Sequence, residues 1–231
     1  MMNELNLVSS ATVTKHNPIV KVRPYVPCLQ IEWMISKRCN FDCSYCPPIW
    51  HDKTSKDLTL DELKNAWLKI IKVSEHKTEQ KIHLTILGGE PSLNKNLLPF
   101  LQWARNNFSD RIGQIGTITN GSANSNFYTE LVSYCDWVTF STHSEFMNER
   151  KFFRNVIKAH RASKKKNAMV MVNLMQESWF NERIHLYQKF LNKFNIANYM
   201  HQIEYNEGFN EFNGKRADVK PVKLIKKMKF I

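Results

Sequence analysis

The 231-residue chain has no run of about 18 apolar residues without charges, the least that a membrane-spanning helix requires. Its first residues also lack the basic and then apolar pattern of a secretory signal. We therefore expect no membrane partner and a cytoplasmic location. The length and the 42% apolar content are enough for one sizeable core, which favours one domain.

Cysteine is scarce, and the number of cysteines is odd. Five cysteines, three of them clustered, do not fit the paired framework of a disulfide-stabilised domain and indicate metal or redox chemistry instead. Cys135, between a helical pattern and a strand pattern, is typical of a small buried apolar residue. Cys28 lies only eleven residues before the first clustered cysteine, so it is a possible further neighbour of that cluster.

The three clustered cysteines are Cys39, Cys43 and Cys46, spaced C-x3-C-x2-C directly after an apolar stretch. Three thiolates within eight residues can reach one metal centre, and soft sulfur ligands select iron-sulfur clusters, zinc or copper(I). A 4Fe-4S cluster with three protein thiolates keeps one iron open for chemistry. A second interpretation adds His51, which gives C-x3-C-x2-C-x4-H, a closed zinc site in a nucleic-acid-binding module. A third keeps the cluster in an electron carrier or sensor, although such proteins usually have four cysteine ligands.

A second motif lies downstream, where the apolar run 84–87 leads into Gly88, Gly89, Glu90 and Pro91. Glycine allows the backbone to approach a ligand closely, Glu90 offers an acceptor, and Pro91 stiffens the turn. Without the cysteines, an ordinary turn between a strand and a helix would explain the motif equally well.

Together and in this order, the two motifs resemble those of radical S-adenosylmethionine (SAM) enzymes, with Tyr45 at the aromatic position of C-x3-C-x-aromatic-C. The resemblance covers residues 31–205. It implies that Cys39, Cys43 and Cys46 bind one 4Fe-4S cluster, whose open iron binds SAM. It further implies reductive cleavage of SAM to methionine and a 5'-deoxyadenosyl radical that abstracts a hydrogen atom from a substrate. An electron donor such as flavodoxin or ferredoxin is then required.

The same resemblance implies which residues surround SAM. Tyr45 would lie against the adenine, and the turn from Gly88 to Pro91 would approach SAM, with Glu90 or a nearby carbonyl accepting from its amino group. Sites in barrels form at the carboxyl ends of strands. The strand ends supply further candidates, namely Asn120, Ser141 and Asn173 for ribose or carboxylate contacts and His143 for a polar or proton-transfer role. The run 169–175 lacks the glycine pattern that often marks the SAM carboxylate site in this family.

Short apolar runs alternate with segments of helical period, which predicts β-α units and a parallel sheet. Thr59 and Glu62 form a capping box at the start of one helix, and Asn181 is the predicted N-cap of the last. Because a closed eight-unit barrel takes about 250 residues, six units predict an α/β fold with a partial (β/α)6 barrel. The expected strands are 31–35, 82–87, 115–119, 137–141, 169–173 and 200–205. The expected parts are an arm (1–30), a core domain (31–205) and a basic tail (206–231).

The formal net charge of +12 is concentrated in the segments 149–166 and 215–229, with eight basic residues against one acidic and seven against one. Basic blocks of this kind suit an acidic partner, although a solvated helix face explains them as well. No RNA-recognition motif accompanies them. With an open barrel, the charge favours a peptide or protein substrate first and nucleic acid second. Other reactions of small molecules, nucleosides or tRNA remain alternatives. No cysteine follows Cys135, so we expect one cluster only.

Overall fold

The structure, a computed structural model, describes residues 28–47, 49–75, 81–176 and 181–203. Six strands form one parallel sheet in the order β1-β2-β3-β4-β5-β6, so each strand lies beside its neighbours in sequence. β1 and β6 form the two edges, and the sheet is therefore open. This confirms the predicted α/β fold with a partial barrel. The strands are β1 (Cys28–Met34), β2 (Lys81–Leu87), β3 (Ile112–Thr119), β4 (Trp137–Ser141), β5 (Met169–Gln176) and β6 (Ala197–Gln202).

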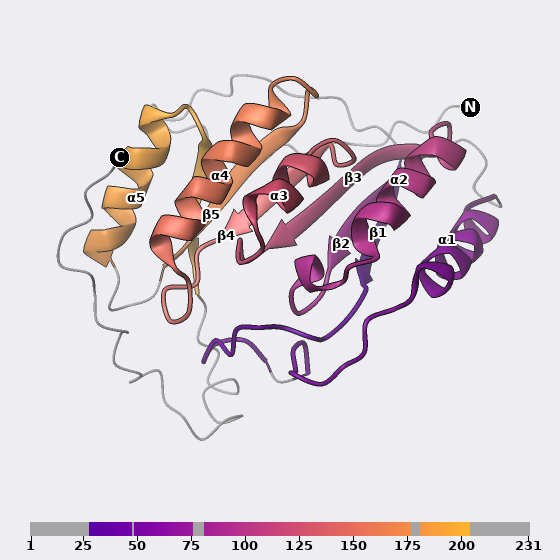
Figure 1. The fold of residues 1–231 in the computed structure, drawn as a ribbon, viewed down its shortest axis with the longest axis horizontal. Coiled ribbons are helices and arrows are strands. Elements are labelled where there is room, and N and C mark those ends of the chain that lie inside the picture. Colours follow the sequence, from indigo (N-terminus) through magenta and orange to yellow (C-terminus); the bar gives the residue numbers. More distant parts are fainter. Residues whose placement is uncertain (1–27, 48, 76–80, 177–180, 204–231) are drawn as a thin grey trace, which may run out of the picture.

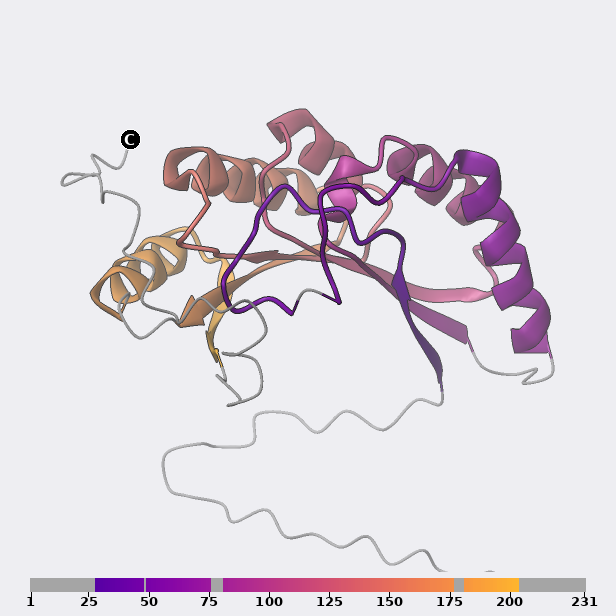
Figure 2. The ribbon, with the colours of Figure 1, turned by 90° about the horizontal axis from the view of Figure 1, so that it is seen from below.

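The helices pack along the convex side of the curved sheet, as Figures 1 and 2 show. In the described part of the chain no helix covers the concave side, and none is long and apolar enough to cross a membrane. The long segment between the first strand and the first helix crosses the carboxyl ends of the strands. The helices are α1 (Leu60–Glu75), the 3-10 helix η1 (Pro91–Leu93), α2 (Leu97–Phe108), α3 (Ser125–Leu131), α4 (Glu149–Ser163) and α5 (Asn181–Lys193).

The core lies between the sheet and the helices because the side chains alternate along each strand. In β2, Ile82, Leu84 and Ile86 are buried against the helices, whereas His83 and Thr85 between them are more exposed. Full burial of apolar side chains on this scale provides the main favourable contribution to folding. This packing fixes the positions of the carboxyl ends of the strands relative to one another.

The start of α1 confirms the predicted capping box. The Thr59 hydroxyl accepts from the backbone N–H of Glu62 at 3.2 Å, and the Glu62 carboxylate accepts from the backbone N–H of Thr59 at 2.8 Å. This exchange satisfies donors that the first helical turn leaves unpaired. The helix then buries Leu63, Trp67 and Ile71 on one face. α1 is thus fixed at the point where the cysteine segment ends.

Several predicted boundaries differ from the structure. β3 begins at Ile112, three residues earlier than expected, and β5 continues to Gln176, three residues further. β1 begins at Cys28, because residues 28–30 pair with residues 81–83 of the second strand. β6 begins at Ala197, three residues earlier than expected, after Asn195 turns the chain with a φ of 55°. Asn181 is the first residue of α5 rather than the residue before it. Residues 1–27 of the expected arm, residues 204–205 and the basic tail lie outside the described residues.

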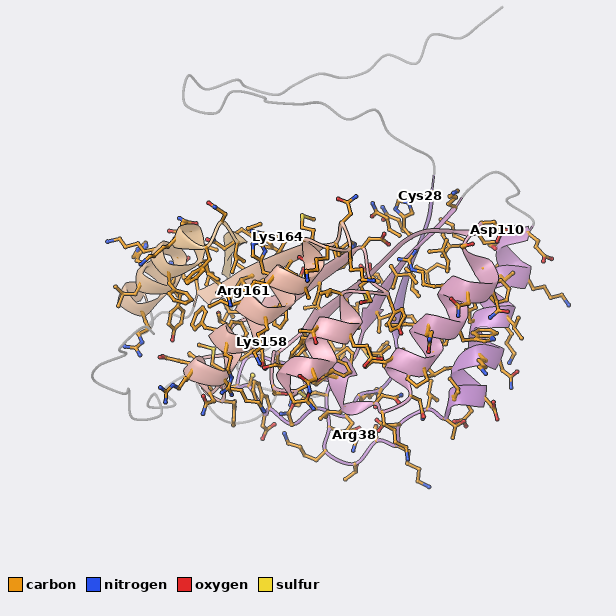
Figure 3. The ribbon with its side chains drawn as sticks, turned by 45° about the horizontal axis from the view of Figure 1, so that its top comes forward. Cys28, Arg38, Asp110, Lys158, Arg161 and Lys164 are labelled. Atoms are coloured by element: carbon orange, nitrogen blue, oxygen red, sulfur yellow. The ribbon has the colours of Figure 1, made fainter. Side chains whose placement is uncertain are left out.

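Cys28 does not approach the clustered cysteines. It lies at the amino end of β1, and the strand rises about 3.3 Å per residue over the six steps to Met34. Figure 3 accordingly shows Cys28 at the upper edge of the fold and Arg38, which precedes Cys39, at its lower edge. The prediction for Cys135 is confirmed, since this side chain is buried in the core.

Candidate functional site

The cysteine segment begins where β1 ends and is closed at its base by backbone hydrogen bonds. The N–H of Cys39 donates to the Asp52 carbonyl, and the N–H of Asp52 donates to the Lys37 carbonyl, both at 2.8 Å. A turn between Cys43 and Cys46 adds an N–H donation of 3.0 Å from the second to the first. These bonds define a closed loop, residues 39–52, that we call the cysteine loop.

The glycines after β2 lie directly against the start of the cysteine loop. The N–H of Gly89 donates to the Ser36 carbonyl at 2.9 Å, and the N–H of Glu90 donates to the Arg38 carbonyl at 2.8 Å. A Cβ at position 89 would stand 2.3 Å from the Lys37 carbonyl oxygen, and one at Gly88 would stand 2.6 Å from that of Ser36. Glycine is required here for the close approach of two backbones.

Glu90 joins the ends of β2 and β3. Its buried carboxylate accepts from the backbone N–H of Ser92 at 3.0 Å, from the Thr119 hydroxyl at 2.6 Å and from the backbone N–H of Asn120 at 2.6 Å. Burial raises the pKa of this carboxyl, and the three donors oppose that rise. In this structure Glu90 therefore organises the strand ends, and its expected contact with the SAM amino group stays a prediction. Pro91, also buried, begins η1.

The three thiols of the cysteine loop have raised pKa values. Burial is the main cause for each, and it raises the pKa of Cys46 to about 11; for Cys43 the nearby carboxylate of Glu145 adds to the effect. Negative charge on Cys39 and Cys46 also raises the pKa of Cys43, and charge on Cys39 raises that of Cys46. At neutral pH the cluster-free thiols are protonated, and binding of iron must displace these protons.

The donor set fits a multi-iron cluster. Among residues 28–47, 49–75, 81–176 and 181–203, no group of three or more His, Cys, Asp or Glu side chains is arranged to hold a single metal ion. A 4Fe-4S cluster takes each thiolate on a different iron, so its ligands need not converge on one point. Three thiols on one closed loop meet that requirement.

Side chains that directly follow β3 bind Asn40, between Cys39 and Cys43. The Asn120 amide donates to the Asn40 side-chain oxygen at 3.0 Å and lies 4.0 Å from the sulfur of Cys39. The Ser122 hydroxyl also donates to Asn40, at 3.3 Å. The structure thus brings the predicted residue Asn120 to the cysteine loop itself.

The loop after β4, residues 142–148, holds the other parts of the cysteine loop. Glu145 is buried and accepts from the backbone N–H of Ser44 at 2.8 Å and from its hydroxyl at 2.5 Å. Phe146 stacks on Phe41, with ring centroids 5.8 Å apart. No local pattern points to Glu145, because its partner Ser44 lies 101 residues earlier in the chain.

His143 contacts both the aromatic residue and one cysteine of the motif. Its Nδ1 lies 2.5 Å from the Tyr45 hydroxyl and 3.6 Å from the sulfur of Cys43, and its ring stacks on that of Tyr45. Burial lowers the pKa of His143 to about 4, so the imidazole is neutral at pH 7. The expected proton-transfer role of His143 and the adenine contact of Tyr45 stay predictions.

Ser141 ends β4 and lies beside Asn173, which is inside β5 and not at its end as the sequence predicts. They are register partners, so both point to the same face of the sheet, and both are buried. The side-chain oxygen of Asn173 is buried without a hydrogen-bond partner among the described residues. A buried acceptor of this kind requires a donor. The hydroxyl or amino groups of SAM are donors of the right chemistry, so the pair fits that molecule.

His51, the proposed fourth zinc ligand, is instead engaged within the cysteine loop. Its Nε2 lies 3.0 Å from an Asp42 carboxylate oxygen, and its Nδ1 lies 3.2 Å from the Pro47 carbonyl oxygen. Both ring nitrogens therefore stabilise the loop.

Comparison with known proteins adds independent findings. Residues 32–167 match the family model described as "4Fe-4S single cluster domain". Curated relatives named GTP 3',8-cyclase include one from Paracoccus denitrificans, 25% identical over 178 residues that cover 72% of this chain and 49% of the relative. Another, from Pasteurella multocida, is 34% identical over 90 residues that cover 38% and 24%.

A solved structure titled "Native anSMEcpe with bound AdoMet" shares the fold. It superposes with a TM-score of 0.55 and 16% identity over 77% of this chain and 52% of that one. The chain spans about half the length, or less, of these relatives.

Proposed function

Because this chain belongs to the 4Fe-4S single cluster domain family, within the radical SAM superfamily, we propose that it abstracts a hydrogen atom from a peptide or protein substrate. Its cofactors are a 4Fe-4S cluster and SAM. The observation that carries the proposal is the closed cysteine loop, which carries three thiols and lies against the segments that follow β2, β3 and β4. The family match favours this cluster over the zinc site with His51.

The chain's own residues bind and orient the cofactors. Cys39, Cys43 and Cys46 would hold the cluster, and the turn after β2 fixes the base of their loop. When bound and reduced, the cluster supplies the electron that cleaves SAM to methionine and the 5'-deoxyadenosyl radical. Ser141 and Asn173 would orient SAM from the concave side of the sheet, opposite the core residues that precede them in β4 and β5, and His143 would remain neutral beside it.

The substrate class rests on shape and charge. In the described part of the chain no helix covers the concave side of the sheet. Along the outer face of α4, exposed cations recur every three or four residues at Arg150, Arg154, Lys158 and Arg161, and Figure 3 shows the last two beside Lys164. None of them forms an ion pair with another described residue. An acidic segment of a macromolecular substrate would complement this face.

A nucleotide is the second candidate substrate, because the curated relatives are named GTP 3',8-cyclases. The proposal also includes a cytoplasmic location and an electron donor such as flavodoxin or ferredoxin.

The decisive experiment is an anaerobic assay. The protein is reconstituted with iron and sulfide, reduced and mixed with SAM, and 5'-deoxyadenosine is measured by mass spectrometry. Cys43→Ala should abolish the product, whereas Cys28→Ala, a cysteine at the opposite end of β1, should retain it. A colourless, zinc-containing protein without product, or an active Cys43→Ala variant, would contradict the proposal.

The substrate class is tested with a deuterated cell extract. The extract is divided by ultrafiltration into macromolecules and small molecules, and each fraction is added to the reduced enzyme with unlabelled SAM. Deuterium in 5'-deoxyadenosine from the macromolecular fraction supports a peptide or protein substrate. Deuterium only from the small-molecule fraction, or from labelled GTP, would favour the second candidate.

A further inference from the structure

Each residue that lies between two cysteines of the motif contacts a side chain from another part of the chain. Asn40 is bound by Asn120 and Ser122, and Asp42 by His51. The loop after β4 binds the other three, namely Phe41 through Phe146 and His143, Ser44 through Glu145, and Tyr45 through His143. The cysteine loop is therefore ordered by the protein before any metal is considered.

Glu145 differs from the other contacts because it brings a buried acidic group to the cluster site. Its two oxygens take both the N–H and the hydroxyl of Ser44, the residue directly after Cys43. The carboxylate lies close enough to Cys43 to act on the charge of its sulfur. No salt bridge to Glu145 occurs among the described residues, so its charge is not offset by a cation there.

We propose that Glu145 is a positioning residue that fixes the spacer between Cys43 and Cys46 and keeps the reduction potential of the cluster low, an inference that rests on the proposed function. Two physical effects act in the same direction. Negative charge beside a cluster opposes the addition of an electron. Hydrogen bonds to cluster sulfurs also change the reduction potential. Because Glu145 accepts from both the N–H and the hydroxyl of Ser44, these two donors are directed to the carboxylate and not to a sulfur. A low potential is what reductive cleavage of a sulfonium requires.

Two substitutions separate the effect of the Glu145 charge from the effect of its hydrogen bonds to Ser44. Glu145→Gln removes the charge but can still accept from the Ser44 N–H and donate to its hydroxyl. Glu145→Ala removes both. Glu130→Gln, on the exposed surface of α3, is the matched control for loss of one carboxylate.

The first measurement is a redox titration of the reconstituted proteins followed by EPR. Glu145→Gln should bind the same amount of iron as the wild type, but its cluster should reduce at a less negative potential, whereas Glu130→Gln should match the wild type. An unchanged potential in Glu145→Gln overturns the electrostatic part of the proposal.

The second measurement needs no cofactor. Hydrogen exchange of residues 40–47 in the cluster-free protein should be slow in the wild type and in Glu145→Gln, and at least tenfold faster in Glu145→Ala. Equal exchange in all three overturns the positioning role. If the wild type binds no cluster, the proposed function fails, but the exchange experiment still decides whether Glu145 holds the loop.

Discussion

Gly89→Ala tests whether the turn after β2 supports the cysteine loop. The added Cβ would lie 2.3 Å from the Lys37 carbonyl oxygen, whereas non-bonded carbon contacts are optimal near about 3.5 Å. The two segments must therefore separate by about 1 Å. Both backbone hydrogen bonds between them, of 2.9 and 2.8 Å, would then exceed the usual range.

The expected loss of stability follows from these two bonds. Each contributes about 1 kcal/mol, and the lower entropy of the unfolded chain with alanine offsets about 0.4–1 kcal/mol. Gly89→Ala should thus lower the free energy of unfolding by about 1–2 kcal/mol. Because the displaced residues directly precede Cys39, iron loading and SAM affinity should fall as well.

The control is Gly113→Ala in β3. There the added Cβ would meet the imidazole of His83 at 2.5 Å, a side chain that can rotate away, rather than backbone. Urea denaturation of the cluster-free proteins gives the stability, and anaerobic calorimetry of the reconstituted proteins gives the affinity for SAM. Equal stability, iron loading and SAM affinity of the Gly89→Ala and Gly113→Ala variants would refute the role of the turn.

Two further predictions concern buried ionisable groups. Glu90→Ala leaves three buried donors unpaired at about 1–3 kcal/mol each, so urea denaturation should show a loss of about 3 kcal/mol or more. A loss no larger than that of the exposed control Glu130→Ala would contradict this. Burial raises the pKa values of Cys39, Cys43 and Cys46 above those of the unfolded chain. Above about pH 8.5 the folded cluster-free protein therefore binds more protons than the unfolded chain, and its stability falls as the pH rises. Urea denaturation at pH 7 and 9.5 should show this loss of stability in the wild type and a much smaller loss in the variant with serine at all three positions. Equal losses in the two proteins would show that the three thiols do not cause the pH dependence.

The sequence predicts those parts of the fold that depend on local patterns. The alternation in β2 and the capping box of Thr59 and Glu62 involve residues within one element, so their periods and spacings are visible directly. The cysteine spacing is local as well. The start of β1 is less visible, because its first residues are defined by pairing with residues 81–83 and not by an apolar pattern of their own.

The surroundings of the cysteine loop could not be predicted, since they depend on contacts between distant parts of the chain. Ser44 and Glu145 meet only because β1 and β4 end at the same edge of one sheet. The glycines after β2 were expected to face SAM, and the motif contains nothing to show that they also pack against residues 36–38. In both cases the sequence shows the residue types but does not predict which residues they contact.

The sequential order of the strands has a consequence for synthesis on the ribosome. Each strand pairs with the one made just before it, so the sheet can grow as the chain emerges, without waiting for distant partners. The cysteine loop is different. It is made early, but its supports at Asn120 and Glu145 emerge much later. A nascent chain stalled before β4 would therefore expose three thiols without the support of Glu145, and one stalled before Asn120 would lack both supports. Delivery of iron is best matched to a nearly complete chain.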